Sequence, residues 1–194
     1  MKYSDSELLN RVKSLPRYRG MPKNLIIAVR SKTDTPNVFD DKMYVYINEK
    51  FVMVTSCTTN PGAPILTGGW KKYNKKGAAV LKADEIYYDT YRRSNGTTIR
   101  HHNGKMPCLR QVKPMAYYRD GNNDTKTDTV GNIEIANNST NIHFNSYNIW
   151  NKIKTTIVGV WSAGCQVLND SNDYNRLINL FGDEPVSYAL LNEF

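Results

Sequence analysis

The sequence contains few cysteines, and their arrangement excludes two common roles. Cys57, Cys108 and Cys165 include no C-x-x-C pair, so a structural zinc site is not expected. An odd number of cysteines without a secretory leader also argues against a disulfide framework. We therefore expect at least one free thiol, no resident metal and no cofactor. Cys57 and Cys108 are interpreted as packing residues.

Long apolar segments are also missing. The first residues, MKYSDSELLNRV, lack the apolar centre of a signal peptide, and no later stretch is long enough for a membrane-spanning helix. We expect a protein that is made in the cytoplasm of a host cell and has no membrane partner. If its substrate lies in the periplasm or the cell wall, delivery as a phage lysis protein or inside a phage virion would be required.

Long basic runs are absent, although the chain is basic overall. The 26 Lys and Arg residues outnumber the 18 Asp and Glu residues, for a net charge of +8, yet the longest basic runs are doublets such as Lys71-Lys72. This charge is compatible with simple solubility, and also with attraction to nucleic acid, an anionic surface or a carboxylate-rich wall polymer. Because no nucleic-acid-binding module accompanies it, we expect no nucleic-acid partner.

The sequence does contain many short runs of Val, Ile, Thr and Tyr, which favour strands over helices. Runs of this kind predict strands at 25–31, 43–48, 51–56, 132–136, 141–144, 155–161 and 186–191. A capping box, Ser4-Asp5-Ser6-Glu7, predicts a helix that stops at Pro16, and a second helix is predicted at 172–181. No repeat or linker divides the chain. We expect one mainly β domain over 1–194, with residues 1–20 as an N-terminal helical extension.

The segment Ser162-Ala163-Gly164-Cys165 is the first candidate for chemistry. It places a thiol after two small residues, at the end of a β-rich run and before a polar loop. Main-chain N–H groups can converge in such a turn, and glycine permits the close approach that it requires. A lone cysteine after an apolar run is otherwise an ordinary buried residue.

His143 changes this interpretation. It lies in the predicted strand 141–144, and two adjacent strands can bring an imidazole and a thiol within hydrogen-bonding distance. A neighbouring base activates a cysteine nucleophile by accepting its proton. One alternative is a structural histidine. Another is a zinc ion held by His102, His143 and Cys165, although no H-x-H or H-E-x-x-H spacing supports it.

The order I-H, a β-rich run and then S-x-G-C resembles the L,D-transpeptidase (YkuD-like) domain, whose signature is a histidine followed by S-H-G-C. The likeness extends from about residue 43 to residue 168, and residues 60–64 occupy the place of a loop that borders the family's active site. It is closer still to a phage-borne branch that reads N-I-H and W-S-A-G-C-Q-V, as residues 141–143 and 161–167 do here. The resemblance implies a β-sandwich or partly closed barrel with an N-terminal and a C-terminal helix.

Carried over to the matching positions, the resemblance implies roles for five residues. Cys165 would be the nucleophile, and His143 the general base. Family members commonly orient this histidine through the main-chain carbonyl of the next residue, here Phe144. The N–H groups of Gly164 and Cys165 would hold the oxyanion of the intermediate, and Ser162 would brace the turn.

Departures from the family signature bear on the substrate. Ala163 stands where the family has the histidine of S-H-G-C, which removes a side-chain donor, and His101 or His102 could enter the cleft in its place. Val167 replaces a common Arg or Asn, and Gln166 is polar where the family is usually apolar. These changes leave the nucleophile and the base intact, but they make a shift from transpeptidation toward hydrolysis plausible.

The sequence also suggests residues that contact the substrate. The expected set consists of His102, Trp161, Gln166 and Arg119. Trp70, Trp150 and Trp161 are expected in the core rather than as sugar-binding platforms, although Trp161 is close enough to the motif to line a pocket. Arg110 and Arg119 could each pair with a substrate carboxylate, although solvation at the surface is the simpler interpretation.

Together these features predict a cysteine-dependent hydrolase or acyltransferase that acts on peptidoglycan stem peptides through a thioester. A phage endolysin-type or virion-associated lytic enzyme is the favoured form. The alternatives are a cross-linking L,D-transpeptidase and a non-catalytic wall-binding or virion structural protein of the same fold. The expected partner is the peptidoglycan peptide, joined in the virion alternative by other virion proteins, and the sequence indicates no particular oligomeric state.

Overall fold

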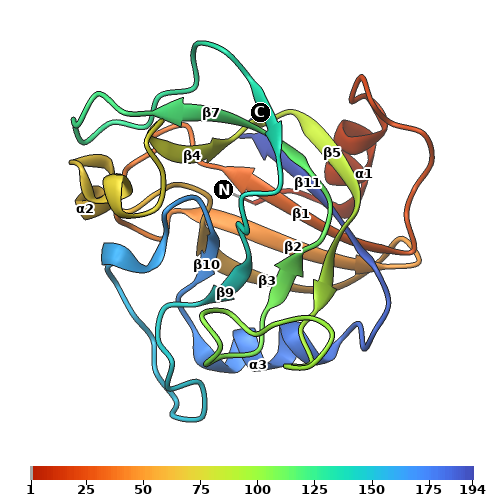
Figure 1. Cartoon of the computed structure of the whole chain (residues 1–194). Coiled ribbons are helices and arrows are strands. Elements are labelled where there is room, and N and C mark those ends of the chain that lie inside the picture. The colour runs from red at the N-terminus through yellow and green to blue at the C-terminus, as the bar shows by residue number, and fades with distance from the viewer. Residues whose placement is uncertain (1) are drawn as a thin grey trace.

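The structure is a computed structural model and describes residues 2–194. Its central feature is a closed barrel of eight strands (Figure 1). Around the barrel the strands are, in order, β1 (Asn24–Arg30), β11 (Val186–Asn192), β5 (Glu85–Arg93), β6 (Leu109–Gln111), β9 (Ile142–Phe144), β10 (Gln166–Leu168), β3 (Lys50–Thr58) and β2 (Asp41–Ile47). The prediction of a mainly β fold is confirmed, and the barrel is closed rather than partly closed.

A second sheet of three strands packs against the barrel. It contains β4 (Ala78–Leu81), β7 (Met115–Asp120) and β8 (Glu134–Ala136), in that order. Leu81 and Tyr117 of this sheet belong to the same apolar core as Ile26 and Val45 of the barrel. The sequence pattern does not predict β4 to β7, which are either short or interrupted by charged residues.

Strand β1 is buried along its whole length because both of its faces are covered. Ile26 belongs to the interior core, and Ile27 belongs to an outer cluster that includes Leu8 and Val12 of α1 (Asp5–Lys13). A strand covered on both faces is expected to be continuously apolar rather than alternating. The predicted N-terminal helical extension therefore packs on the outside of the barrel.

Both predicted helices are present. The capping box of α1 forms, because the Glu7 N–H donates to Ser4 Oγ at 3.3 Å and the Ser4 N–H donates to Glu7 Oε2 at 2.7 Å. Helix α3 (Ser171–Asn179) begins after Asp170, whose side chain caps it, and packs across one end of the barrel (Figure 1). A single turn, α2 (Ala63–Leu66), follows β3. Among residues 2–194, none of the helices combines the length and apolar character needed to cross a membrane.

The predicted strand at 155–161 is wrong. The segment is irregular and ends in a short 3-10 helix, Gly159–Trp161. Gly159 has a φ of +59°, which a strand does not accommodate. Ile157 and Val160, which suggested an apolar strand, are exposed to solvent rather than packed in the core.

The parallel pair β9 and β10 positions the candidate site. Val167 lies opposite His143 and Leu168 lies opposite Phe144, and the Gln166 N–H donates to the Asn141 carbonyl at 3.0 Å. Because Cys165 directly precedes β10, this register brings its thiol to the same end of the barrel as the His143 ring. The segment between them, residues 145–164, makes the crossover that a parallel pair requires.

Candidate active site

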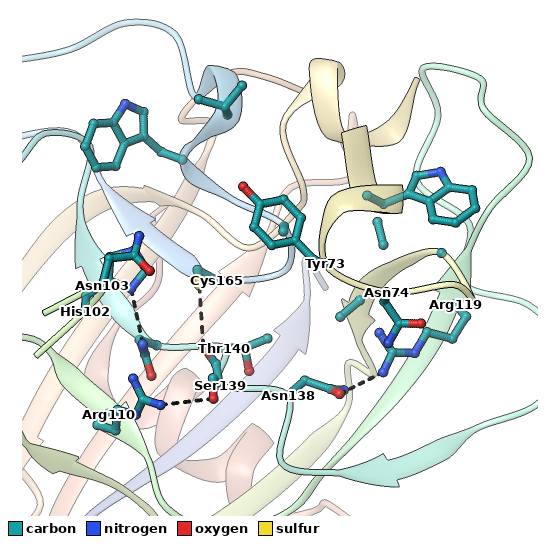
Figure 2. A pocket seen from close by; sticks show the side chains of 18 of the residues that line it. Tyr73, Asn74, His102, Asn103, Arg110, Arg119, Asn138, Ser139, Thr140 and Cys165 are labelled. Atoms are coloured by element: carbon teal, nitrogen blue, oxygen red, sulfur yellow. Dashed lines mark hydrogen bonds between the residues drawn. The ribbon is translucent and has the colours of Figure 1, made fainter. Parts of the chain in front are cut away.

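A cavity of about 490 Å³ lies beside the start of β10. Cys165 lies in its wall with 9 % of the residue exposed, whereas Cys57 and Cys108 are fully buried and do not line it. Figure 2 shows Cys165 between Tyr73 on one side and the segment 138–140 on the other. Cys165 is therefore the one of the three thiols that a substrate in this cavity can reach.

The turn before Cys165 is held on both sides. Ser162 Oγ donates to the Cys165 carbonyl at 2.8 Å, and the Ala163 carbonyl accepts from the Ala79 N–H of β4 at 3.3 Å. Gly164 has a φ of +126°, and a Cβ at this position would lie 2.4 Å from the Ala79 carbonyl oxygen. Only glycine satisfies both conditions. The role predicted for Ser162 as the brace of this turn agrees with its hydrogen bonds.

The two predicted oxyanion donors are not equivalent. The Gly164 N–H points to Ser162 Oγ at 3.3 Å, so it already has an acceptor. The Cys165 N–H has no acceptor within residues 2–194. Of the two predicted donors, only the Cys165 N–H is therefore free to bind a further acceptor, and Gly164 shapes the turn.

His143 is oriented as the resemblance implies. Its Nδ1 lies 2.8 Å from the Phe144 carbonyl oxygen, so Nδ1 carries the proton and Nε2 is left as the acceptor. The residue is fully buried, and Nε2 has no hydrogen-bond partner within the described chain. Ring nitrogens of His102 and His143 and the sulfur of Cys165 all lie within 4.8 Å of one another. A separation of this size is common between catalytic groups before substrate closes the contact.

Burial sets the charge of both groups. It raises the pKa of the Cys165 thiol to about 12, and the nearby N–H of Asn141 offsets this only in part. Burial, and then the neighbouring His102, lower the pKa of His143 to about 3, although the carbonyls of Phe144 and Trp161 act in the opposite direction. At neutral pH the pair therefore consists of a protonated thiol and a neutral imidazole. Such a pair works by proton transfer during attack rather than from a preformed thiolate.

The sequence left open whether His101 or His102 enters the cleft, and the structure places His102 in the cavity wall. Its ring stacks on that of His143, with centroids 3.8 Å apart and 24° between the planes. Amide nitrogens of Asn141 and Asn103 lie 3.2 Å from its two ring nitrogens. Burial and then Arg110 lower the pKa of His102 to about 4, so it too is neutral near pH 7. His101 points elsewhere and contacts Ser94 Oγ at 2.8 Å.

His102, His143 and Cys165 are also the one group within residues 2–194 with the composition of a metal site. Their arrangement fits zinc poorly. The lone pairs of two nearly parallel stacked rings run side by side, whereas zinc needs them to converge on a point about 2.0–2.1 Å from each nitrogen. Both ring nitrogens of His102 also face amide nitrogens. The geometry favours a thiol and its base over a tetrahedral metal centre.

The floor of the cavity is a buried polar network. Gln111 Oε1 accepts from the Thr140 N–H at 3.0 Å and from the Tyr117 hydroxyl at 3.2 Å. The Tyr91 hydroxyl donates to the Thr140 carbonyl at 3.0 Å. These bonds fix the segment that carries Ser139, whose carbonyl lies 3.8 Å from Cys165 Sγ. The thiol is thus held over a rigid support.

The predicted substrate-contacting residues divide into two groups. Trp161 lines the cavity and meets the Tyr147 ring edge-on at 4.8 Å, and His102 and Arg119 also line it. Gln166 does not, because it is fully buried and its amide bonds to the Gly164 carbonyl and the Tyr188 hydroxyl. The structure therefore corrects the prediction that Gln166 contacts the substrate, because this side chain does not reach the cavity.

The tryptophans differ in the same way. Trp70 is buried apart from the edge that lines the cavity, as expected for a packing residue. Trp150 was expected in the core, but it is 83 % exposed. It lies in the irregular crossover between β9 and β10, where no sheet or helix covers it.

The cavity wall contains two arginines and no carboxylate. Arg119 is neutralised from outside the cavity, because its Nε lies 2.7 Å from Glu134 Oε2. Arg110 donates to Ser139 Oγ at 3.2 Å and has no carboxylate partner within residues 2–194. Figure 2 shows the two arginines at opposite ends of the segment 138–140.

Several cavity residues have no signal in the sequence. Ser139, Thr140 and Asn141 belong to a stretch that reads as an ordinary turn and the start of a strand, and Tyr147 lies in an irregular loop. The asparagine-rich pattern at 137–141 was the available hint, because buried amides and hydroxyls need partners. Comparisons with protein-family models, with curated proteins and with solved structures found no match to this chain.

Proposed function

We propose that this protein is a cysteine-dependent enzyme that transfers or hydrolyses acyl groups of peptidoglycan stem peptides. One observation carries the proposal. It is the buried His143, whose Nδ1 donates to the Phe144 carbonyl, whose Nε2 has no hydrogen-bond partner in the described chain, and which has a ring nitrogen within 4.8 Å of the thiol of Cys165 at the cavity wall. A buried base without a partner is costly unless it acts on something.

The first half of the reaction follows from this pair. Cys165 Sγ attacks a peptide carbonyl of the substrate, and the thiol proton passes to His143 Nε2 as the carbon–sulfur bond forms. The Cys165 N–H donates to the oxyanion of the tetrahedral intermediate. When the carbon–nitrogen bond breaks, the imidazolium returns its proton to the leaving amine, and a thioester remains on Cys165.

The second half regenerates the enzyme. Water or an amine attacks the thioester carbonyl, and His143 accepts the proton of this nucleophile. The sulfur then leaves and is reprotonated by His143. Water as the nucleophile gives hydrolysis, and an amine gives a new cross-link. The sequence of proton transfers needs no metal and no group outside this pair.

The substrate class is supported by two observations of different kinds. The N-I-H and W-S-A-G-C-Q-V motifs resemble a phage-borne branch of the L,D-transpeptidase domain, which acts on peptidoglycan stem peptides. The cavity is rich in amides and hydroxyls, namely those of Asn74, Asn103, Asn138, Ser139, Thr140 and Asn141, and these groups suit a peptide backbone. A lytic enzyme delivered by a phage is the form that we favour.

The test is mass spectrometry of purified muropeptides incubated with wild type, with Cys165→Ala and with Cys57→Ala as a thiol control. We expect new fragments with wild type and Cys57→Ala and none with Cys165→Ala. New cross-links in place of fragments would assign transpeptidation instead. If no protein changes any muropeptide while all three bind cell walls equally, the proposal fails in favour of a binding protein.

A further inference from the structure

Arg110 is the one charged group of the cavity wall whose charge nothing in the described chain offsets. It lies in β6, directly opposite Arg92 of β5, and like charges in directly opposite positions destabilise a sheet. Arg92 is exposed and donates to the Asp183 carbonyl, so it adds a second positive charge beside Arg110 and brings no carboxylate with it. Packing and sheet pairing therefore do not account for an arginine at this position.

Arg110 and the thiol share a neighbour. The guanidinium donates to the hydroxyl of Ser139, and Cys165 Sγ lies 3.8 Å from the carbonyl of the same residue. Figure 2 shows both contacts converging on Ser139 from the same cavity. A substrate group bound by Arg110 therefore lies next to the carbonyl that Cys165 attacks.

The chemistry of Arg110 specifies what it binds. A guanidinium presents N–H donors in a planar fork that matches the two oxygens of a carboxylate, and such bonds are shorter and stronger than neutral ones. Its one side-chain partner, Ser139, is a neutral hydroxyl, and the amides of Asn103 and Asn141 line the same cavity. None of them competes for the positive charge. The subsite is therefore complementary to an anion that enters with the substrate.

We propose that Arg110 is a specificity-determining residue that binds a carboxylate of the substrate beside the reacting carbonyl. This inference rests on the proposed function for the identity of the reaction, but the carboxylate site itself is independent of it. Stem peptides offer a terminal carboxylate and side-chain carboxylates, which share this chemistry. Arg119 does not take this role, because Glu134 already occupies its Nε at 2.7 Å.

The first experiment uses two small reagents that differ in one carboxylate. Iodoacetate and iodoacetamide are reacted separately with wild type, Arg110→Gln, Arg110→Lys and Arg119→Gln, and modification of Cys165 is followed by mass spectrometry. We expect the iodoacetate to iodoacetamide rate ratio to fall roughly tenfold in Arg110→Gln, because an ion-paired hydrogen bond of this kind is worth about a factor of ten or more. Arg110→Lys should keep part of the ratio, and Arg119→Gln should keep nearly all of it.

Two outcomes would overturn the inference. One is an unchanged ratio in Arg110→Gln, and the other is an equal fall in Arg119→Gln, which would indicate a general effect of charge. If Cys165 resists both reagents, equilibrium binding of a stem tetrapeptide with a free or an amidated C-terminus decides the same question. Equal affinity of wild type and Arg110→Gln for the free form would then refute the site.

A second experiment separates this inference from the proposed function. Turnover of tetrapeptides amidated at the terminal or at the side-chain carboxylate is compared in wild type and Arg110→Gln, and the amidation that removes the difference identifies the bound carboxylate. An Arg110-dependent alkylation ratio without muropeptide turnover would keep the carboxylate site and reject the substrate class. Turnover that is indifferent to Arg110 and to both amidations would keep the function and reject the site.

Discussion

Two buried polar clusters occupy neighbouring parts of the barrel, one on β2 and β3 and the other on β9 and β10. In the first, Asp41 has both oxygens occupied, because Oδ1 accepts from the Ser31 N–H at 2.8 Å and Oδ2 accepts from the Thr59 N–H and hydroxyl at 2.6 and 2.7 Å. In the second, His143 Nε2 and the Cys165 N–H have no partner within residues 2–194. Asp41 and His143 are both fully buried.

We interpret this difference as the one between a structural cluster and the reactive cluster proposed above. A buried polar group without a partner costs free energy, so such groups are rare unless their incompleteness serves a function. At the Asp41 cluster both oxygens of the carboxylate have donors, and Arg30 adds bonds to Thr59 Oγ1 and to the Leu81 carbonyl, although Arg30 Nη1 has no partner within residues 2–194. Around the thiol, three groups have no full partner in the described chain. His143 Nε2 has no donor, the Cys165 N–H has no acceptor, and Arg110 has no carboxylate to offset its charge. The open positions match what a peptide carbonyl and a carboxylate would supply.

Removing the base should have the largest effect. His143→Gln keeps a polar side chain of similar size but no group that accepts a proton near neutral pH. We expect muropeptide turnover to fall about a thousandfold, in the range typical of a lost general base. The measurement is turnover by mass spectrometry, with thermal unfolding as the check on folding. His101→Gln is the matched control, and turnover that survives in His143→Gln would remove this residue from the chemistry.

The protonation of the pair can be read from the thiol alone. With the pKa of Cys165 raised to about 12 by burial, the thiolate fraction rises tenfold with each pH unit across the neutral range. We therefore expect the rate of Cys165 alkylation by iodoacetamide to rise about a hundredfold between pH 7 and pH 9. The fully buried Cys57 in the same digest serves as an internal control. A rate that is constant over this range would mean a preformed thiolate–imidazolium pair instead.

The sequence predicts the chemistry of the thiol cluster better than its surroundings. The pattern predicts the strand of His143, and the His143–Phe144 contact is local in the chain, but the β-rich run at 155–161 is not a strand, and Cys165 instead precedes β10, which the pattern does not predict. Two contacts cannot be predicted from the sequence, because each joins segments that are far apart in the chain. They are the close approach of Ala79 to the turn at Gly164 and the stacking of His102 on His143. Such contacts depend on the closed barrel, which no local pattern specifies.

The errors have physical causes of the same kind. Gln166 is polar where the resembling family is usually apolar, but its side chain is buried inside the barrel, where its amide bonds to the Tyr188 hydroxyl and not to a substrate. Trp150 was assigned to the core because large apolar residues are usually buried. Arg119 and Arg110 look equivalent in the sequence, and only the placement of Glu134 on β8 distinguishes them.

The structural cluster should respond to pH in its stability. Burial raises the pKa of Asp41 to about 6, while the N–H of Ser31 and the contacts with Thr59 oppose this rise. A carboxyl group with a raised folded-state pKa stabilises most at low pH, and this contribution is lost as the pH rises from about 4 through about 6. We expect the difference in unfolding free energy between wild type and Asp41→Asn to shift against wild type by about 2–3 kcal/mol over this interval.

Denaturant unfolding of both proteins at pH 4, 5, 6 and 7 measures this difference. Asp34→Asn is a suitable control, because Asp34 is only partly buried and lies at the edge of the same cluster. A difference that grows in favour of wild type as the pH rises would show that Asp41 is ionised and well solvated by its donors. The specific alkylation rate of Cys165 should be the same in folded wild type and Asp41→Asn.

The smallest effect tests whether the floor of the thiol cluster behaves like the Asp41 cluster. Thr140 Oγ1 bonds to Gln111 Oε1 at 3.0 Å and to the Tyr117 hydroxyl, and Thr140→Val keeps the shape while removing these bonds. We expect a loss of about 1 kcal/mol in unfolding free energy, because Gln111 Oε1 keeps two other donors. Alkylation of Cys165 by iodoacetamide at pH 8 should stay within about threefold of wild type, and the exposed Thr98→Val should change neither quantity. A loss of Cys165 reactivity without a loss of stability would instead place Thr140 in the reactive cluster. The polar network below Ser139 would then support the chemistry of the thiol and not only the fold.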